Sequence, residues 1–169
     1  MNAWVLFDWG DTLMRVFPEY RGKMRDWPRV QEIPGARKAL HSLHGRIGIA
    51  LATNAADSEE KDIRQALERA DLSSFIKRIY CLKSVGAKKS SPEFFAHVLK
   101  DLHTTPDRLV MVGDEYAEDV ESALAAGLRA VWFNETSHEV RTGHNLATLQ
   151  HLEHLPALLH AWGLLREAH

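Results

Sequence analysis

Short apolar runs alternate along the chain with segments whose apolar residues are spaced three or four positions apart. The runs predict buried strands at residues 3–7, 47–53, 79–82, 109–112 and 128–133. The spaced segments predict helices near residues 35–44, 58–70, 91–102, 115–126 and 156–165, with Asp57 or Ser58 as the N-cap of the second. This alternation favours an α/β fold, in which helices cover both faces of a parallel sheet.

Residues 15–34 interrupt the pattern, because they show no clean period and contain three of the six prolines. The segment carries basic and aromatic side chains, so two interpretations are open: an ordered loop pinned by its aromatics, or a basic lip facing a substrate. The sequence contains no internal repeat, low-complexity tract or linker. We therefore expect a single domain over residues 1–169, in which residues 15–34 form a loop or a minimal cap beside the site.

Composition narrows the class of protein. The hydrophobic fraction of 45% and the charged fraction of 26% are ordinary for a globular protein, and the net charge of −2 gives no general electrostatic case for binding nucleic acid or membranes. The single cysteine, Cys81, lies in an apolar run and is expected to be a buried thiol. Because no signal-peptide or membrane-spanning pattern is recognised, a cytoplasmic protein follows by elimination.

Polar groups follow directly after three of the predicted strands. Asp8, Thr53 and Asp114 occupy these positions, and parallel strands present all their carboxyl ends at one edge of the sheet. Lys89 precedes a helix, and Asp119 lies in the opening turn of another. Carboxylates from different strands suit an oxygen-liganded cation such as Mg²⁺, whereas a hydroxyl and an ammonium suit a transferred anionic group.

These residues, in this order, resemble the motifs of the haloacid dehalogenase (HAD) superfamily over roughly residues 3–134. The segment Asp8-Trp-Gly-Asp-Thr-Leu is similar to the first motif, whose first Asp is the nucleophile. Thr53 with Asn54 resembles the second, Lys89 before Ser-Ser-Pro the third, and Gly113-Asp114 with Asp119 the acidic fourth.

The resemblance implies a three-layer Rossmann-like fold with about five parallel strands in the order 5-4-1-2-3 and no large cap. It also implies Mg²⁺ as cofactor and the following roles. The catalytic residues would be Asp8, Thr53 and Lys89; the phosphate would contact Thr53, Asn54 and Lys89; and the metal would contact Asp8, the Gly10 carbonyl, Asp114 and Asp119.

One position departs from the family pattern. Phosphatases of the family carry a second Asp two residues after the nucleophile, which protonates the leaving group and then activates water, and this chain has Gly10 there. The carbonyl needed for metal binding is retained, but a positioned general acid is worth about 10²–10⁴ in rate. Whether the neighbouring Asp11 replaces it is left open by the sequence.

Three hypotheses follow. The first is a Mg²⁺-dependent phosphohydrolase that forms an aspartyl-phosphate on Asp8 and prefers good leaving groups. The second is a hydrolase of carbon–halogen or related bonds, which would leave the acidic fourth motif without a task. The third is a catalytically weak or inactive binding protein of the same fold, a hypothesis sustained by Gly10.

The spacing of the motifs also bears on the partners. Asp8 and Thr53 are 45 positions apart and Thr53 and Lys89 are 36 apart, which leaves no room for a separate cap domain in either interval. An open site allows a small phosphorylated substrate, a larger one, or a homodimer in which a partner subunit covers the site.

Overall fold

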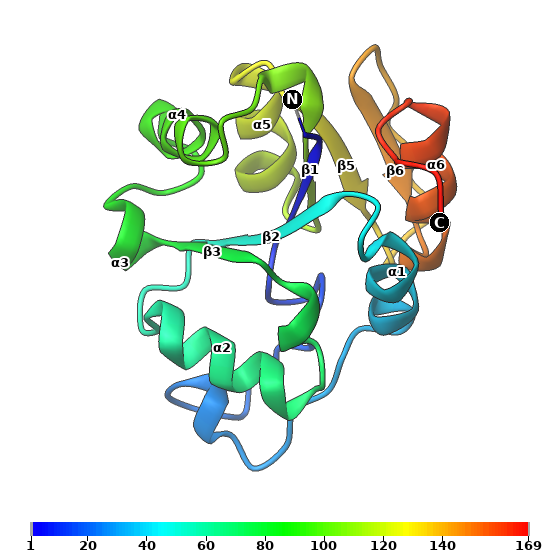
Figure 1. Ribbon diagram of the computed structural model, residues 1–169. Coiled ribbons are helices and arrows are strands. Elements are labelled where there is room, and N and C mark those ends of the chain that lie inside the picture. Colours follow the sequence, from blue (N-terminus) through cyan, green and yellow to red (C-terminus); the bar gives the residue numbers. More distant parts are fainter. Residues whose placement is uncertain (1, 169) are drawn as a thin grey trace.

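The computed structural model describes residues 2–168, which form a sheet of six parallel strands with helices on both sides (Figure 1). The strand order is β3-β2-β1-β4-β5-β6. The strands are β1 (Trp4–Phe7), β2 (Gly48–Thr53), β3 (Arg78–Cys81), β4 (Leu109–Gly113), β5 (Arg129–Phe133) and β6 (Leu146–Leu149). The first five have the order that the family resemblance implies.

The helices divide between the two faces of the sheet. The two core clusters assign α1 (Ala36–Leu43), α2 (Glu60–Arg69) and α6 (Leu155–Ala161) to one face, and α4 (Pro92–Asp101) and α5 (Ser122–Ala125) to the other. The short α3 (Leu82–Val85) directly follows β3. No helix within residues 2–168 combines the length and the apolar character needed to cross a membrane.

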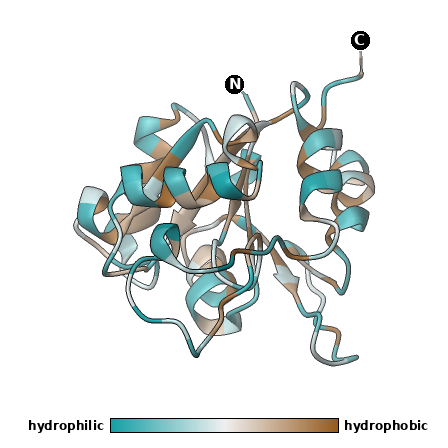
Figure 2. Ribbon diagram, turned by 90° about the horizontal axis from the view of Figure 1, so that it is seen from below, coloured by the Kyte–Doolittle hydropathy of each residue, from teal (hydrophilic) through white to brown (hydrophobic). Residues whose placement is uncertain are grey.

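Alternation along the strands builds the two halves of the core. In β1, Val5 and Phe7 pack towards α1 and α2, whereas Leu6 packs towards α4 and α5, and all three are fully buried. Because both faces are covered, the central strands are apolar throughout, as parallel sheets require. The hydropathy colouring shows the apolar strands between helices that turn their polar sides outward (Figure 2). Cys81 is buried, as expected.

The sixth strand was not predicted, because it has no buried apolar run. All four residues of β6 are only partly buried at the edge of the sheet. Backbone hydrogen bonds hold the strand in place: the Ala130 amide donates to the Asn145 carbonyl at 2.8 Å, and the Asn134 amide donates to the Leu149 carbonyl at 2.8 Å. Pairing of the backbone, rather than burial of side chains, therefore defines β6.

Two helix starts also differ from the prediction. The N-cap of α2 is Glu59, not Asp57 or Ser58, because the Asp62 carboxylate accepts a hydrogen bond from the Glu59 amide at 2.9 Å and closes a capping box. The helix predicted after Asp114 begins as a π-helix, Tyr116–Glu121, which then continues as α5. Single π-helical turns are frequent at functional sites.

Candidate active site

The carboxyl ends of the central strands bring Asp8 and Lys89 together. Asp8 follows β1, and its amide donates to the Val112 carbonyl of β4 at 2.9 Å, which fixes the backbone at the edge of the sheet. The Lys89 Nζ lies 2.8 Å from Asp8 Oδ1 and also donates to the Ala52 carbonyl at 3.2 Å. Lys89 is only 3% exposed, so its charge depends on these neighbours.

Asp119 is the second partner of the Lys89 ammonium. The two are joined at 2.6 Å through Asp119 Oδ1, while Asp119 Oδ2 accepts from the Glu115 amide at 3.1 Å. Both oxygens of this buried carboxylate are therefore engaged. Its position depends on Gly113, because a Cβ there would lie 2.1 Å from Asp119 Oδ2. The glycine thus leaves the space that the carboxylate occupies.

Thr12 joins the first and fourth motifs. Its hydroxyl lies 3.2 Å from Asp8 Oδ2 and 3.2 Å from Asp114 Oδ1, and the residue is fully buried. A hydroxyl has one hydrogen to donate, so it serves one of the two carboxylates at a time. The position of Asp114 is also fixed through its carbonyl, which accepts from the Trp132 indole at 3.0 Å.

The crowding of these acids shifts their proton affinities. Burial, together with the charge of Asp8, raises the pKa of Asp114 from 3.8 to about 8. Burial and the same neighbour raise the pKa of Asp119 to about 7, although Lys89 opposes that shift. Burial alone would lower the pKa of Lys89, but the charges of Asp8 and Asp119 outweigh it and raise the pKa above 10.5. Lys89 is therefore a cation at neutral pH.

The donor set fits a hard divalent cation. Asp8, Asp114 and Asp119 each offer a carboxylate oxygen, and these oxygens lie within 4.8 Å of one another. With all three ionised, the single ammonium of Lys89 leaves two negative charges in excess. Oxygen ligands with such an excess are what Mg²⁺ and Ca²⁺ require.

The two residues of the second motif hold the site together in different ways. The Thr53 hydroxyl accepts from the Ala55 amide at 3.1 Å, and its residue lines the cleft described below. The Asn54 side chain accepts from the Lys89 amide at 2.8 Å and donates to Glu118 at 2.8 Å. Asn54 thus connects the second, third and fourth motifs. The sequence analysis missed the contribution of Glu118. Its contact with Asn54 depends on the π-helix, in which it is the third residue.

The position of the missing acid is closed by packing. A Cβ on Gly10 would lie 2.8 Å from the Cγ2 of Val16, so a larger residue requires that side chain to move. The backbone of Asp11 has a positive φ of 57°, and its carboxylate accepts from the Val16 amide at 3.0 Å. It also lies 3.7 Å from the Arg15 guanidinium. Asp11 is not among the residues that line the cleft beside Asp8.

A cleft of about 440 Å³ opens onto Asp8. One wall belongs to residues 15–34, which we call the strap. The strap contributes Val16, Gly22, Met24 and Trp27 to the lining. The lining also includes three acidic residues, Asp57, Glu115 and Glu118.

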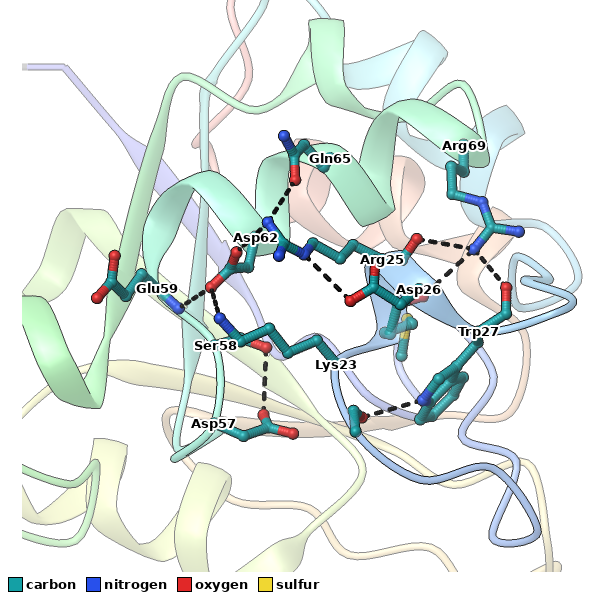
Figure 3. A network of polar contacts seen from close by, with 12 residues as sticks. Lys23, Arg25, Asp26, Trp27, Asp57, Ser58, Glu59, Asp62, Gln65 and Arg69 are labelled. Carbon is teal, nitrogen blue, oxygen red and sulfur yellow. Dashed lines mark hydrogen bonds and ion pairs between the residues drawn. The ribbon is translucent and has the colours of Figure 1, made fainter.

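Basic residues of the strap bind α2 (Figure 3). Lys23 Nζ and an Arg25 guanidinium nitrogen each lie 2.8 Å from the fully buried Asp62 carboxylate. The hydrogen bond from Lys23, with that from the Glu59 amide, lowers the pKa of Asp62 to about 2. From α2, Arg69 donates to the Trp27 carbonyl at 2.7 Å. Two of the basic side chains therefore anchor the strap instead of facing a substrate.

Comparison with known proteins identifies the family. The sequence model of the family described as haloacid dehalogenase-like hydrolase matches residues 6–133, and the chain belongs to this family. A curated relative, glyceraldehyde 3-phosphate phosphatase from Pyrococcus furiosus, is 32% identical over 107 residues, which cover 62% of this chain and 42% of that protein. The chain spans about half the length of the curated relatives it matches.

Solved structures support the fold. An uncharacterised protein from Listeria monocytogenes superposes with a TM-score of 0.81 at 22% identity, covering 95% of this chain and 98% of that one. The HAD hydrolase YfnB from Bacillus subtilis, solved bound to magnesium, superposes with a TM-score of 0.73 at 15% identity over 94% of this chain and 98% of that one. At these identities the likeness concerns the fold alone.

Proposed function

We propose that this chain is a Mg²⁺-dependent phosphohydrolase in which Asp8 is the nucleophile. The observation that carries the proposal is the contact of the buried Lys89 ammonium with Asp8 and Asp119, beside a third carboxylate, Asp114. A buried array of this kind is costly unless it serves chemistry, and a carboxylate at an open cleft is able to attack phosphorus. The phosphatase relative supports the same reaction class.

Two displacements at phosphorus make up the reaction. An Asp8 oxygen attacks phosphorus, the bond from phosphorus to the leaving oxygen breaks, and that oxygen departs with the electron pair. A water oxygen then attacks the aspartyl-phosphate, the bond to Asp8 breaks, phosphate leaves and the water protons pass to phosphate and solvent. Lys89, 2.8 Å from Asp8 Oδ1, would offset negative charge at the nucleophile, and Thr53, which lines the cleft, would donate to the phosphoryl oxygens.

Asp8, Asp114 and the Gly10 carbonyl would hold Mg²⁺, with Asp119 as a further acid of the group. Bound there, the ion would offset the negative charge of the carboxylates and the substrate phosphate. Because both oxygens of Asp119 accept other hydrogen bonds, its main task in this proposal is to place Lys89.

The strap acts as a minimal cap in this proposal. Val16, Met24 and Trp27 give the cleft an apolar wall, while Asp57, Glu115 and Glu118 add acidic groups to its lining. The leaving group would lie against that apolar wall. Aryl or acyl phosphates also fit the lack of an acid at Gly10, because their leaving oxygens depart without a proton.

The test is hydrolysis of para-nitrophenyl phosphate with Mg²⁺ and with EDTA. Asp8→Asn should lower kcat by more than about 10⁴-fold, since the nucleophile is lost. Asp11→Asn is the matched control, because its carboxylate is next in the motif but bonds to Val16 and Arg15, and Asn tolerates its positive φ. Turnover that survives in Asp8→Asn, or needs no divalent ion, would overturn the proposal.

Gly10 and the orientation of Asp11 favour a second candidate, a binding protein that retains cation and phosphate affinity with little turnover. Calorimetry distinguishes the two. Mg²⁺ and phosphate binding that depends on Asp8 and Lys89, without turnover on aryl or acyl phosphates, would select the binding protein.

A further inference from the structure

Four cations line a small cavity at the amino ends of the strands, opposite the catalytic edge. The cavity has a volume of about 140 Å³ and is lined by Arg46, Lys77, Arg108 and Arg166, together with Trp4 and Gly48. Gly48 begins β2 and Thr53 ends it, five residue steps away. At about 3.3 Å per residue, Gly48 lies roughly 16 Å from Thr53.

The cations of this cavity have no anionic partners. Among residues 2–168, none of the four forms an ion pair, and no Asp or Glu lines the cavity. Arg108 has its Nε buried without a hydrogen-bond partner, and its sequence neighbour Asp107 does not pair with it. A buried donor left unpaired costs free energy that a bound acceptor would recover.

Contacts with the backbone and with an aromatic ring fix the walls of the cavity. Arg46 Nε donates to the Arg166 carbonyl at 3.0 Å, and the Arg166 amide donates back to the Arg46 carbonyl at 3.0 Å. The Trp4 ring lies where a Cβ of Gly48 would be, at 2.3 Å, and Lys77 Nζ lies 6.0 Å from the centre of that ring. The lining therefore comes from five separate stretches of the chain: residues 2–4, 45–48, 77, 108 and 163–166.

We infer that this cavity binds a small oxyanion, namely phosphate or the terminal phosphate group of a metabolite. Three guanidinium groups and an ammonium are the donors that phosphate oxygens accept most strongly. The volume admits a tetrahedral oxyanion but not a nucleotide. The site is separate from the proposed catalytic site and does not depend on its activity.

The test follows backbone and indole N–H signals by NMR while inorganic phosphate is added to the full chain. We expect saturable shifts of the Gly48 and Gly163 amides and of the Trp4 indole, which Trp4→Phe assigns. Thr53 and Asn54 report phosphate in the catalytic cleft separately. Phenylphosphonate, which has no P–O–C bond to hydrolyse, tests whether the cavity accepts an organic substituent. If the cavity binds inorganic phosphate but not phenylphosphonate, the ligand is the free ion. If it binds both compounds, the ligand is the phosphate group of a metabolite.

Variants locate the binding. Arg108→Gln and Lys77→Gln should each weaken the phosphate affinity of the cavity about tenfold, because each removes a charged donor. Lys61→Gln, an exposed change on α2, is the matched control for lost charge. The Lys77 ammonium makes no hydrogen bond within residues 2–168, and only the Lys77 backbone is bonded, so this variant reads out binding even where Arg108→Gln disturbs the fold. Unmoved Gly48 and Gly163 signals, or equal effects of Lys61→Gln, would overturn the inference.

Discussion

The same strands carry opposite charge at their two ends. At the carboxyl ends of β1, β2 and β4, three carboxylates crowd around one ammonium, and nearly every oxygen has a partner. At the amino ends, four cations surround a cavity without a carboxylate among the described lining residues. The first arrangement is a network with an excess of negative charge, and the second is a set of cations that form no ion pair within residues 2–168.

The difference shows how a parallel fold separates two kinds of binding. Helices run antiparallel to the strands, so their C-termini, which carry partial negative charge, lie at the amino edge of the sheet. Arg46 lies three residues after the end of α1, so that helix end itself favours a cation there. At the carboxyl edge the helix N-termini carry partial positive charge and favour anions, and Lys89 adds a full positive charge there.

Replacing Lys89 should have the largest effect at the carboxyl ends of the strands. Lys89→Ala leaves Asp8 and Asp119 without their cation, and removing one member of a buried pair costs about 3–5 kcal/mol of folding free energy. Turnover and vanadate binding should be lost as well. In a urea titration, the double variant Lys89→Ala/Asp119→Asn should lose less folding free energy than the sum of the losses of the two single variants. Losses that simply add would exclude the coupling between the two residues.

Gly10→Asp sharpens the account of the carboxyl end. An added acid should raise kcat/KM on alkyl phosphates towards the roughly 10²–10⁴-fold of a positioned general acid, while aryl phosphates gain little. Because the new Cβ meets Val16 at 2.8 Å, the variant should be made with and without Val16→Ala. The strain is steric and not conformational, since the φ of Gly10 is not positive. Efficient hydrolysis of alkyl phosphates by the unaltered chain would show that another acid already serves.

Asp114→Asn tests the cation at the same end. Loss of one charged ligand should weaken Mg²⁺ binding in calorimetry by at least the 10–100-fold typical of outer-shell changes. Glu118→Gln is the matched control, because Glu118 lines the cleft but bonds to Asn54 and not to the acidic group. Equal Mg²⁺ affinity of Asp114→Asn and the unaltered chain would remove Asp114 from the site.

The smallest expected effect on stability is that of the arginine variants at the amino ends of the strands. If Arg46 serves only the C-terminus of α1, Arg46→Gln should cost about 0.3–1 kcal/mol, and phosphate should not alter the melting temperature. Binding at the cavity instead makes the melting temperature rise with phosphate in Asp8→Asn, where catalysis is absent, and less so in Arg108→Gln. Differential scanning fluorimetry measures both.

Much of the fold followed from local pattern. The apolar runs at β1, β2, β4 and β5 have the length and composition of buried parallel strands, and their ends placed Asp8, Thr53 and Asp114 on one edge. β6 was not predicted, because its residues are only partly buried and its place depends on backbone hydrogen bonds to β5. Nothing in its own four residues distinguishes it from a loop.

Only part of the candidate site could likewise be predicted from the sequence. Strand ends and motif spacing predict which groups converge, because the sheet fixes their common edge. The bridging of Asp8 and Asp114 by Thr12 and the contact of Asn54 with Glu118 depend on side-chain geometry between elements far apart in sequence. The binding of Lys23 and Arg25 by Asp62 likewise joins segments almost forty positions apart, which no local period records.

The close approach of Asp119 to Gly113 has a consequence for how this sequence tolerates change. A Cβ at position 113 would occupy the place of the Asp119 carboxylate, 2.1 Å from its oxygen. In a library of all single substitutions, position 113 should therefore accept no side chain while Asp119 is present, whatever its size or polarity. A variant such as Gly113→Ala becomes viable only with a smaller residue at 119, so the two positions are inherited as one unit although they lie on different elements.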